Sequence, residues 1–354
     1  MAADADLTAF KFSACVDWIE LRVRTLPDAD GRATRGDVLR GRLKKFGVSY
    51  VKAVDRGAGG AATHFLVRVQ APETVRDVLA VVDRLAAHRE LAAAPTIAAI
   101  EIAFDARPKT ADRAALDAMT LRLMRGILPP TRELRTPQQW AGFALGLESA
   151  LSAHHRPLDP SRTLYIGTPK VADAGRAGYA HGRLTTSYEA EKGASARADH
   201  ERAFDHAQWR VYRKETDEQF TSDGERRDTD ALQPGEHRAR AEVTLTGQML
   251  RILKLETLDD LATFDFSTIA TKKLLRFVRV SGHPFFADAS RQGLIVNALG
   301  IDKRTPAHIV AAFWHRDERG RENDLGQFLV ADTDLNRRLK EQLARLSRRF
   351  RAIG

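Results

Sequence analysis

Three segments of this chain alternate apolar and polar residues with a period of two, and this pattern constrains the fold more than any other feature. Successive side chains of a β-strand point to opposite faces, so such alternation indicates a strand with one face on a core and one polar face. The first segment places Trp209 and Val211 on its apolar face and Arg210, Tyr212 and Lys214 on its polar face. The chain therefore predicts a sheet with a chemically reactive face.

The other two segments add carboxylates to a polar face of the same kind. In residues 238–245, Glu242 lies on the polar side, and in residues 97–105 the polar side carries Glu101 and Asp105. Glu101 and Asp105 are four residues apart, which is about 13 Å along a strand that rises about 3.3 Å per residue. Both can bind one ion only if the strand bends, or if one of them acts through water.

The elements around these strands alternate between strand and helix. The pattern predicts a strand at 16–24, a helix at 35–46, a strand at 63–70, a helix from Pro72 to about Ala92 and a helix at 112–125. In the first strand, strict alternation puts Asp17 on the side of Ile19 and Leu21, opposite Trp18. This order is typical of an α+β fold with antiparallel or mixed sheets, in which helices cover one face and the other face binds a substrate such as DNA.

The second half of the chain is less regular and more helical. Predicted here are helices at 140–153, 258–262, 269–280 and 307–314, a short strand at 163–167, an exposed insertion at 168–208 and a polar hairpin loop at 223–236. We expect residues 1–250 to form the functional domain and residues 251–354 to form a helical, basic C-terminal region.

The last predicted helix, residues 335–353, has a leucine-rich stripe on one side and a basic face on the other. Two interpretations of the basic face are open, namely a solvated surface of a packing helix and a surface that contacts phosphates. The cations that would contact nucleic acid are Arg337, Arg338, Arg345, Arg348 and Arg349.

Charge and cysteine content narrow the function classes. A formal net charge of +9 favours a polyanionic partner, with nucleic acid ahead of an anionic membrane surface. The single cysteine, Cys15, excludes an internal disulfide and a cysteine-rich zinc module. Neither a secretory signal nor an apolar run long enough to span a bilayer is visible, so we expect a cytoplasmic protein without a membrane partner.

A tyrosine beside acids and cations suits phosphodiester chemistry. A phenolate can attack phosphorus and later leave, but its ordinary pKa of about 10 requires a cation or base to lower it. Arg210, Arg213 and Lys214 are close to Tyr212 in sequence, and Arg210 and Lys214 share its face of the strand. Mg²⁺ or Mn²⁺ would neutralise the phosphate, and Glu101, Asp105 and Glu242 offer the oxygen ligands that these ions prefer. The plainer alternatives are a packing tyrosine and a glutamate in a salt bridge.

Four short motifs together resemble a known family. They are Ile100-Glu101-Ile102-Ala103-Phe104-Asp105, Leu164-Tyr165-Ile166-Gly167, Arg210-Val211-Tyr212-Arg213-Lys214 and Arg240-Ala241-Glu242-Val243-Thr244-Leu245. In this order they resemble the trans-acting rolling-circle replication initiators of plasmids and filamentous phages. The resemblance implies that Tyr212 is the nicking nucleophile and that Glu101, Asp105 and Glu242 bind the metal.

The chain departs from the family pattern at several positions. Ala99 stands where the family has arginine, Glu101 where it has aspartate and Thr244 where it often has another acid. The interval from Gly167 to Tyr212 is long, which leaves Tyr188 open as a second candidate nucleophile. A His-hydrophobic-His metal pair, which another class of nicking enzyme uses, does not occur in the sequence.

The resemblance implies an initiator that binds a replication origin, nicks one strand at a single-stranded or hairpin site, and leaves a 5'-phosphotyrosyl link and a 3' hydroxyl primer. Its expected partners are origin DNA, a host helicase and polymerase, and a second copy of the chain as a homodimer. The first alternative function is a sequence-specific DNA-binding regulator that keeps the scaffold without catalysis, and the second is a structural or RNA-binding protein whose basic charge serves packaging.

Overall fold

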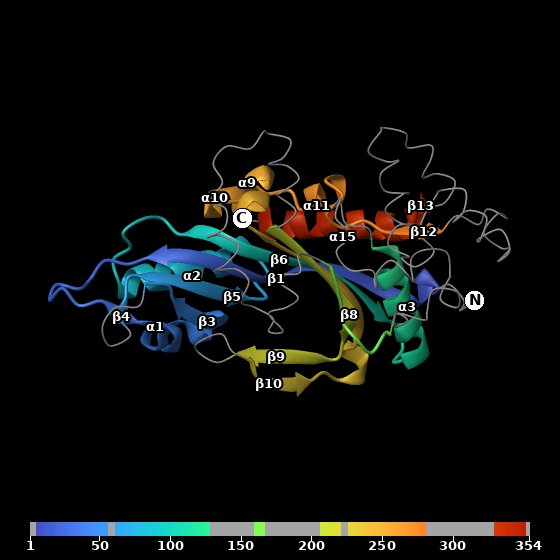
Figure 1. The fold of residues 1–354 in the computed structure, drawn as a ribbon, viewed down its shortest axis with the longest axis horizontal. Coiled ribbons are helices and arrows are strands. Elements are labelled where there is room, and N and C mark those ends of the chain that lie inside the picture. Colours follow the sequence, from blue (N-terminus) through green and yellow to red (C-terminus); the bar gives the residue numbers. More distant parts are fainter. Residues whose placement is uncertain are drawn as a thin grey trace, which may run out of the picture.

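The computed structural model describes residues 5–55, 61–127, 159–166, 206–220, 226–280 and 329–351. A seven-stranded antiparallel sheet forms the centre of the molecule, which confirms the predicted α+β class (Figure 1). In spatial order its strands are β3 (Val48–Ala53), β5 (His64–Gln70), β1 (Phe10–Arg24), β6 (Thr96–Pro108), β11 (Arg238–Thr246), β8 (Ala207–Lys214) and β7 (Leu164–Ile166).

The N-terminal half of the sheet is built from two split β-α-β units. In the first, α1 (Gly36–Leu43) connects β1 to β3, and in the second, α2 (Val75–His88) connects β5 to β6. Each unit leaves room for one antiparallel strand between its own two, so β5 lies between β3 and β1, and β1 lies between β5 and β6. A capping box of Thr74 and Asp77 starts α2 at Val75, three residues later than the sequence predicted.

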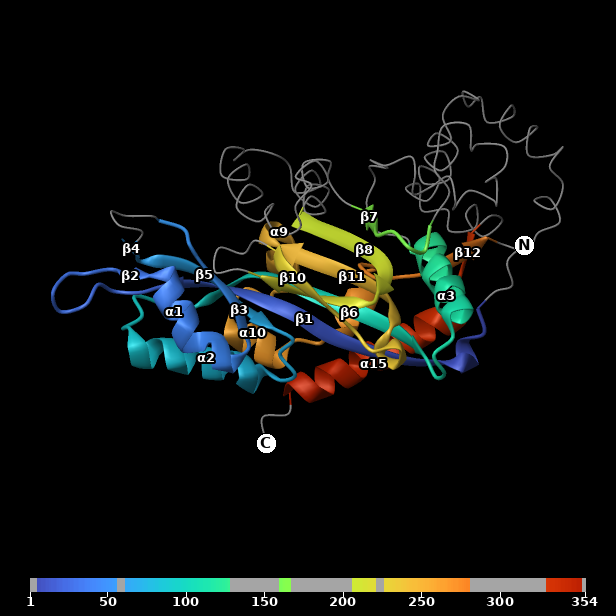
Figure 2. The same cartoon turned by 90° about the horizontal axis from the view of Figure 1, so that it is seen from below.

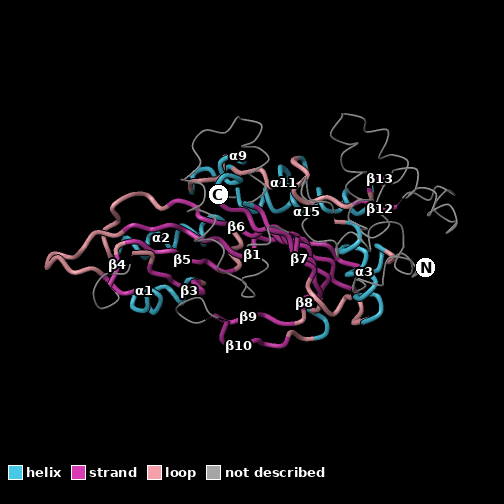
Figure 3. The backbone as a smooth tube through the Cα atoms, viewed as in Figure 1, coloured by secondary structure: helices cyan, strands magenta, loops and turns pink. Residues whose placement is uncertain are grey.

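One face of the sheet is covered by helices and carries the hydrophobic core. The further helices are α3 (Arg113–Gly126), α9 (Gly247–Leu253), α10 (Leu258–Thr263), α11 (Ser267–Thr271) and α15 (Thr333–Arg351). Their apolar residues join those of the strands in a single buried cluster. Burial of each large side chain contributes roughly 1.5–3 kcal/mol, so this face holds the fold together. Figure 3 shows α9, α11 and α15 above the strands of the sheet.

The C-terminal helix α15 packs along β1 through its leucine-rich stripe. The leucines of this stripe have exposed fractions of 1% or less, as their helical spacing predicted; they are Leu335, Leu339, Leu343 and Leu346. Because these residues belong to the same core as the strands, helix α15 is anchored to the sheet. The division of the chain near residue 250 stays a prediction.

Smaller elements complete the described chain. They are η1 (Leu7–Ala9), β2 (Thr34–Arg35), η2 (Lys44–Phe46), β4 (Ala61–Ala62), β9 (Thr216–Phe220), β10 (Arg226–Ala231), η5 (Pro234–Glu236), β12 (Val278–Val280) and β13 (Leu329–Ala331). The segment 223–236, predicted as a loop, contributes β10, which pairs with β9. In Figure 1 this hairpin lies below the sheet, opposite α9, α11 and α15.

The predicted helix at 269–280 is wrong beyond Thr271. Lys273 has a left-handed backbone with φ of 60°, which a helix does not accommodate, and residues 278–280 form β12 against β13. The predicted helices at 140–153 and 307–314, and the insertion except for residues 206–208, lie outside the described residues. Within the described part, every helix is too short or too polar to cross a bilayer.

Candidate metal and phosphoryl-transfer site

The second face of the sheet is polar at its centre, where β1, β6, β11 and β8 lie side by side (Figure 2). Cross-strand register on this face pairs Glu101 with Thr244 and Glu242 with Arg210. It also pairs Arg240 with Tyr212. The predicted alternation therefore places Tyr212, Glu101 and Glu242 on one face, as the sequence indicated.

Three carboxylates meet at the centre of this face. Asp17, Glu101 and Glu242 each contribute an oxygen, and these oxygens lie within 4.8 Å of one another. The side chains of Glu101 and Glu242 are each only 1% exposed, and that of Asp17 is 15% exposed. We refer to these three residues as the acid group.

A β-bulge brings Asp17 into the acid group. Val16 pairs with Ile102 and Trp18 pairs with Glu101, so Asp17 is an extra residue in β1. Such a bulge breaks the alternation and re-aims a side chain. Trp18 Nε1 donates to Glu101 Oε1 at 2.8 Å, and Asp17 Oδ1 accepts from Arg240 at 2.6 Å. Both side chains thus reach the polar face, and the predicted position of Asp17 among the apolar residues is wrong.

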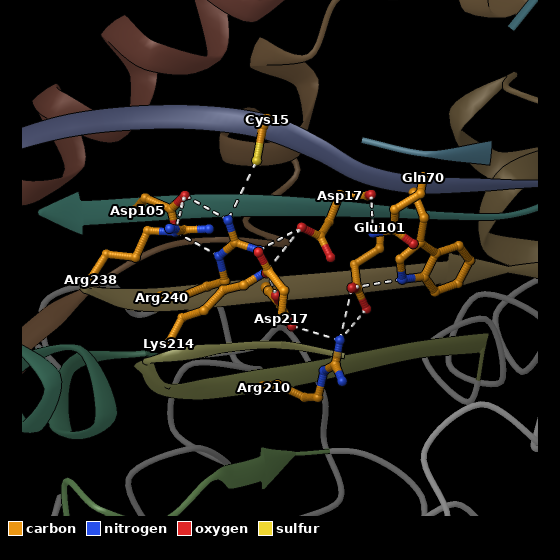
Figure 4. A network of polar contacts seen from close by, with 12 residues as sticks. Cys15, Asp17, Gln70, Glu101, Asp105, Arg210, Lys214, Asp217, Arg238 and Arg240 are labelled. Atoms are coloured by element: carbon orange, nitrogen blue, oxygen red, sulfur yellow. Dashed lines mark hydrogen bonds and ion pairs between the residues drawn. The ribbon is translucent and has the colours of Figure 1, made fainter. Parts of the chain in front are cut away.

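Two arginines neutralise the acid group from opposite sides (Figure 4). Arg210 Nη2 lies 2.7 Å from Glu101 Oε2 and 2.7 Å from Glu242 Oε2. Arg240 Nη1 lies 2.6 Å from Asp17 Oδ1 and 3.3 Å from Glu242 Oε1. Charge compensation of this kind is what allows carboxylates to remain ionised when buried.

Asp105 lies on the same face but apart from the acid group. Its carboxylate accepts two hydrogen bonds from Arg240, from Nε at 2.6 Å and from Nη2 at 2.7 Å. Arg238 Nε approaches it at 3.3 Å. Of the three predicted metal ligands, the structure brings Glu101 and Glu242 together with Asp17, whereas Asp105 holds Arg240 in place.

Tyr212 is hydrogen-bonded to the acid group. Its hydroxyl donates to Glu242 Oε1 at 2.7 Å, and the Arg210 guanidinium carbon lies 5.9 Å from its ring centroid. Burial, followed by repulsion from Glu242, raises the pKa of the Tyr212 phenol well above its ordinary value. In this state the phenol is a donor rather than a nucleophile.

Lys214 follows Arg210 and Tyr212 on the same face of β8. Its Nζ is 3.7 Å from Asp17 Oδ1 and 2.9 Å from Asp217 Oδ1. The three residues predicted as catalytic, Tyr212, Arg210 and Lys214, therefore all border the acid group.

The carboxylates of the acid group differ in their proton affinity. Burial, opposed by Arg210, raises the pKa of Glu242 to about 7. Burial also works against ionisation of Asp17, but attraction to Arg240 and Lys214 outweighs it and holds the pKa of Asp17 well below its usual range. Glu242 is thus the carboxylate best suited to accept a proton near neutral pH.

The donor set fits a hard divalent cation. Mg²⁺ and Mn²⁺ prefer carboxylate oxygens, and three of these converge here. Glu242 Oε2 is buried and contacts Arg210, yet within the described part of the chain it accepts no hydrogen bond of suitable geometry. A buried anionic oxygen without an aligned donor is the kind of atom that a metal ion satisfies.

The basic face of α15 lies on the other side of the sheet. Arg337, Arg345, Arg348 and Arg349 are exposed, whereas Arg338 is half-buried with its guanidinium carbon 4.9 Å from the centroid of Phe12. Since α15 covers the helix-bearing face, its cations lie on the opposite side of the sheet from the acid group.

Sequence reasoning missed Asp17 because a bulge leaves no mark in a pattern of alternation. The only available signal was an aspartate within an apolar row, which is costly unless the side chain is redirected. Tyr188 lies outside the described residues, so the choice between it and Tyr212 rests on the geometry around Tyr212.

Comparison with known proteins gives no match to a family model, a curated protein or a solved structure. The resemblance to rolling-circle initiators therefore stays a prediction.

Proposed function

We propose that the chain is a metal-dependent DNA strand-nicking and strand-transferring enzyme of the rolling-circle initiator type, with Tyr212 as its nucleophile. The observation that carries this proposal is the 2.7 Å hydrogen bond from the Tyr212 hydroxyl to Glu242 Oε1. It joins a hydroxyl that can form a covalent link to phosphorus with a carboxylate whose burial raises its pKa to about 7.

In this proposal one oxygen of Glu242 acts as the proton acceptor and the other acts as a metal ligand. Oε1 accepts the Tyr212 proton. Oε2, which contacts the same Arg210 nitrogen as Glu101, belongs to the ligand set with Glu101 and Asp17. A bound Mg²⁺ or Mn²⁺ supplies charge neutralisation for the phosphate oxygens. The Tyr212 oxygen forms a bond to phosphorus while the bond to the 3' oxygen breaks. The 3' oxygen leaves with the bonding electrons and takes up a proton, so that the proton lost by the phenol is balanced.

Replacement of Glu242 by glutamine tests whether Glu242 accepts the proton and binds the metal ion. Glutamine keeps the size and one hydrogen-bond acceptor but takes no proton and binds a hard cation poorly. We expect nicking of supercoiled origin DNA to fall at least about a hundredfold, with DNA affinity preserved. The matched control is Glu236→Gln, which makes the same change at an exposed position and should leave the rate unchanged. Equal rates for the two variants across a Mg²⁺ titration would remove Glu242 from the mechanism.

The opposed positions of the acid group and the α15 cations suggest separate roles. The exposed arginines of α15 would bind DNA backbone outside the site of cleavage, because they lie on the other side of the sheet from the acid group. Cleavage and affinity should then respond to different substitutions.

The combined variant Arg337→Gln, Arg345→Gln and Arg348→Gln should weaken DNA binding without changing the nicking rate at saturating DNA. Each phosphate contact that is lost should flatten the slope of log affinity against log salt by about 0.9. The control variant removes the same charge from exposed Arg32, Arg42 and Arg84. Identical salt slopes for both variants would mean that α15 only packs on the sheet.

The second candidate function is a DNA-binding regulator without catalysis. It is favoured by the pairing of Arg210 and Arg240 with every member of the acid group, since such a network also suits a purely structural role. Origin footprinting without scission in Mg²⁺ or Mn²⁺ would support this function instead.

A further inference from the structure

A single nitrogen of Arg210 contacts both glutamates of the acid group. Nη2 lies 2.8 Å and 2.7 Å from the two oxygens of Glu101, and 2.7 Å from Glu242 Oε2. Arg210 therefore uses the same oxygens that a divalent cation must bind. Figure 4 shows the guanidinium reaching from β8 toward Glu101.

A divalent cation and this guanidinium compete for the same place. Hard cations bind carboxylate oxygens at about 2.0–2.6 Å, and the oxygens of the acid group are already within 4.8 Å of one another. A cation between them would lie close to Nη2, where two like charges repel strongly because burial reduces screening. The Arg210 guanidinium therefore has to leave the acid group before a divalent cation can bind there tightly.

The surroundings indicate which arginine leaves. The Arg240 side chain is 2% exposed and is fixed by two hydrogen bonds to Asp105. The Arg210 side chain is 20% exposed. Its strand, β8, is covered on the outer side by the three-residue strand β7. Arg210 thus has access to solvent, whereas Arg240 does not.

We propose that Arg210 is a displaceable counter-ion, which neutralises Glu101 and Glu242 in the absence of metal and is exchanged for the divalent cation. The proposal rests on the metal site of the proposed function. The released guanidinium stays on β8 two residues from Tyr212, where it binds the phosphate of the substrate. Arg210 accordingly opposes metal binding and assists substrate binding, and its removal changes the two in opposite directions.

The test is the Mn²⁺ affinity of the DNA-free full-length protein, measured by calorimetry and by electron paramagnetic resonance of free Mn²⁺. Arg210→Met should bind Mn²⁺ about tenfold more tightly than the wild type, because one buried like charge is gone. Arg84→Met removes an exposed charge on α2, at a position outside the proposed DNA contacts, and should match the wild type. In saturating Mn²⁺, Arg210→Met should also show weaker binding of single-stranded DNA.

The thermal stability of the variants separates a binding effect from misfolding. Without metal, Arg210→Met leaves Glu101 and Glu242 without a cation that they share, so its Tm should be lower and should rise more with Mn²⁺ than that of the wild type. Arg210→Lys keeps the positive charge and serves as the second variant if Arg210→Met does not fold. It should bind Mn²⁺ with an affinity between those of the wild type and Arg210→Met.

Two results would overturn the inference in distinguishable ways. Unchanged or weaker Mn²⁺ binding in both Arg210 variants, with wild-type binding that Glu242→Gln abolishes, refutes displacement but keeps the metal site. Absence of Mn²⁺ binding in the wild type and in Arg210→Met refutes displacement together with the metal-dependent function.

Discussion

Replacement of Tyr212 by phenylalanine is expected to abolish strand scission, with a loss of about a thousandfold or more, while DNA affinity stays within about twofold. The substitution removes only the oxygen that would attack phosphorus. The ring is half-buried and keeps its packing, and Glu242 keeps its contacts with Arg210 and Arg240. Relaxation of supercoiled origin DNA in Mn²⁺ measures the first quantity, and a gel-shift titration measures the second.

Tyr50 provides the matched control for this substitution. Its hydroxyl donates to buried Glu20 on the same face of the sheet, in a cluster with Arg68 that lies outside the acid group. Tyr50→Phe should therefore nick at the wild-type rate once folded. A fully active Tyr212→Phe protein would contradict the assignment of the nucleophile and would direct attention to Tyr188.

Replacement of Arg240 by methionine should destabilise the protein by about 3–5 kcal/mol at neutral pH, since it leaves buried carboxylates without their partner. Arg240 is 2% exposed and contacts Asp17, Asp105 and Glu242. The control is Arg238→Met, which removes a 20% exposed side chain whose Nε lies 3.3 Å from Asp105 and should cost less than about 1 kcal/mol. Urea unfolding followed by circular dichroism gives both values.

The destabilisation of Arg240→Met should shrink as the pH falls. In the wild type the pKa of Asp17 is lowered, so its stabilising contribution is present above the ordinary aspartate pKa of about 3.9 and is lost as the pH falls below it. Without Arg240, the largest attraction that lowers the pKa of Asp17 is gone, so this pKa rises and protonation relieves the variant at higher pH than in the wild type. The gap between the two proteins should therefore narrow between pH 7.5 and pH 4.5. A gap that is constant over this range, or no larger than that of Arg238→Met, would show that the ion pairs are not what stabilises this face.

The parts of the site that the sequence predicted depend on regular alternation. Tyr212 and Glu242 lie on the uninterrupted strands β8 and β11, and Glu101 lies on the regular part of β6 that follows the extra residue Ala98. In these stretches a period of two decides the face of each side chain regardless of register. The predicted apolar residues of these strands, such as Trp209 and Val243, are buried in the core for the same reason. Helix α15 was predicted on equally regular grounds, because its leucines recur at helical spacing.

The parts that could not be predicted depend on contacts between distant segments. The bulge at Asp17 is defined by the pairing of β1 with β6. These strands are far apart in the sequence, since Trp18 and its partner Glu101 are separated by 83 residues. The role of Asp105 depends on Arg240 reaching it across the β6–β11 pair. β10 exists only because β9 pairs with it. None of these pairings has a local signal.

Identification of the residue that becomes covalently attached to DNA tests the central claim most directly. The full-length protein is incubated with supercoiled origin DNA and Mn²⁺, digested with protease and nuclease, and analysed by mass spectrometry. We expect a nucleotide adduct on the peptide that contains Tyr212, dependent on the divalent cation and absent from Glu242→Gln. Strand scission with an adduct at any other residue, or complete scission without a covalent adduct, would contradict it.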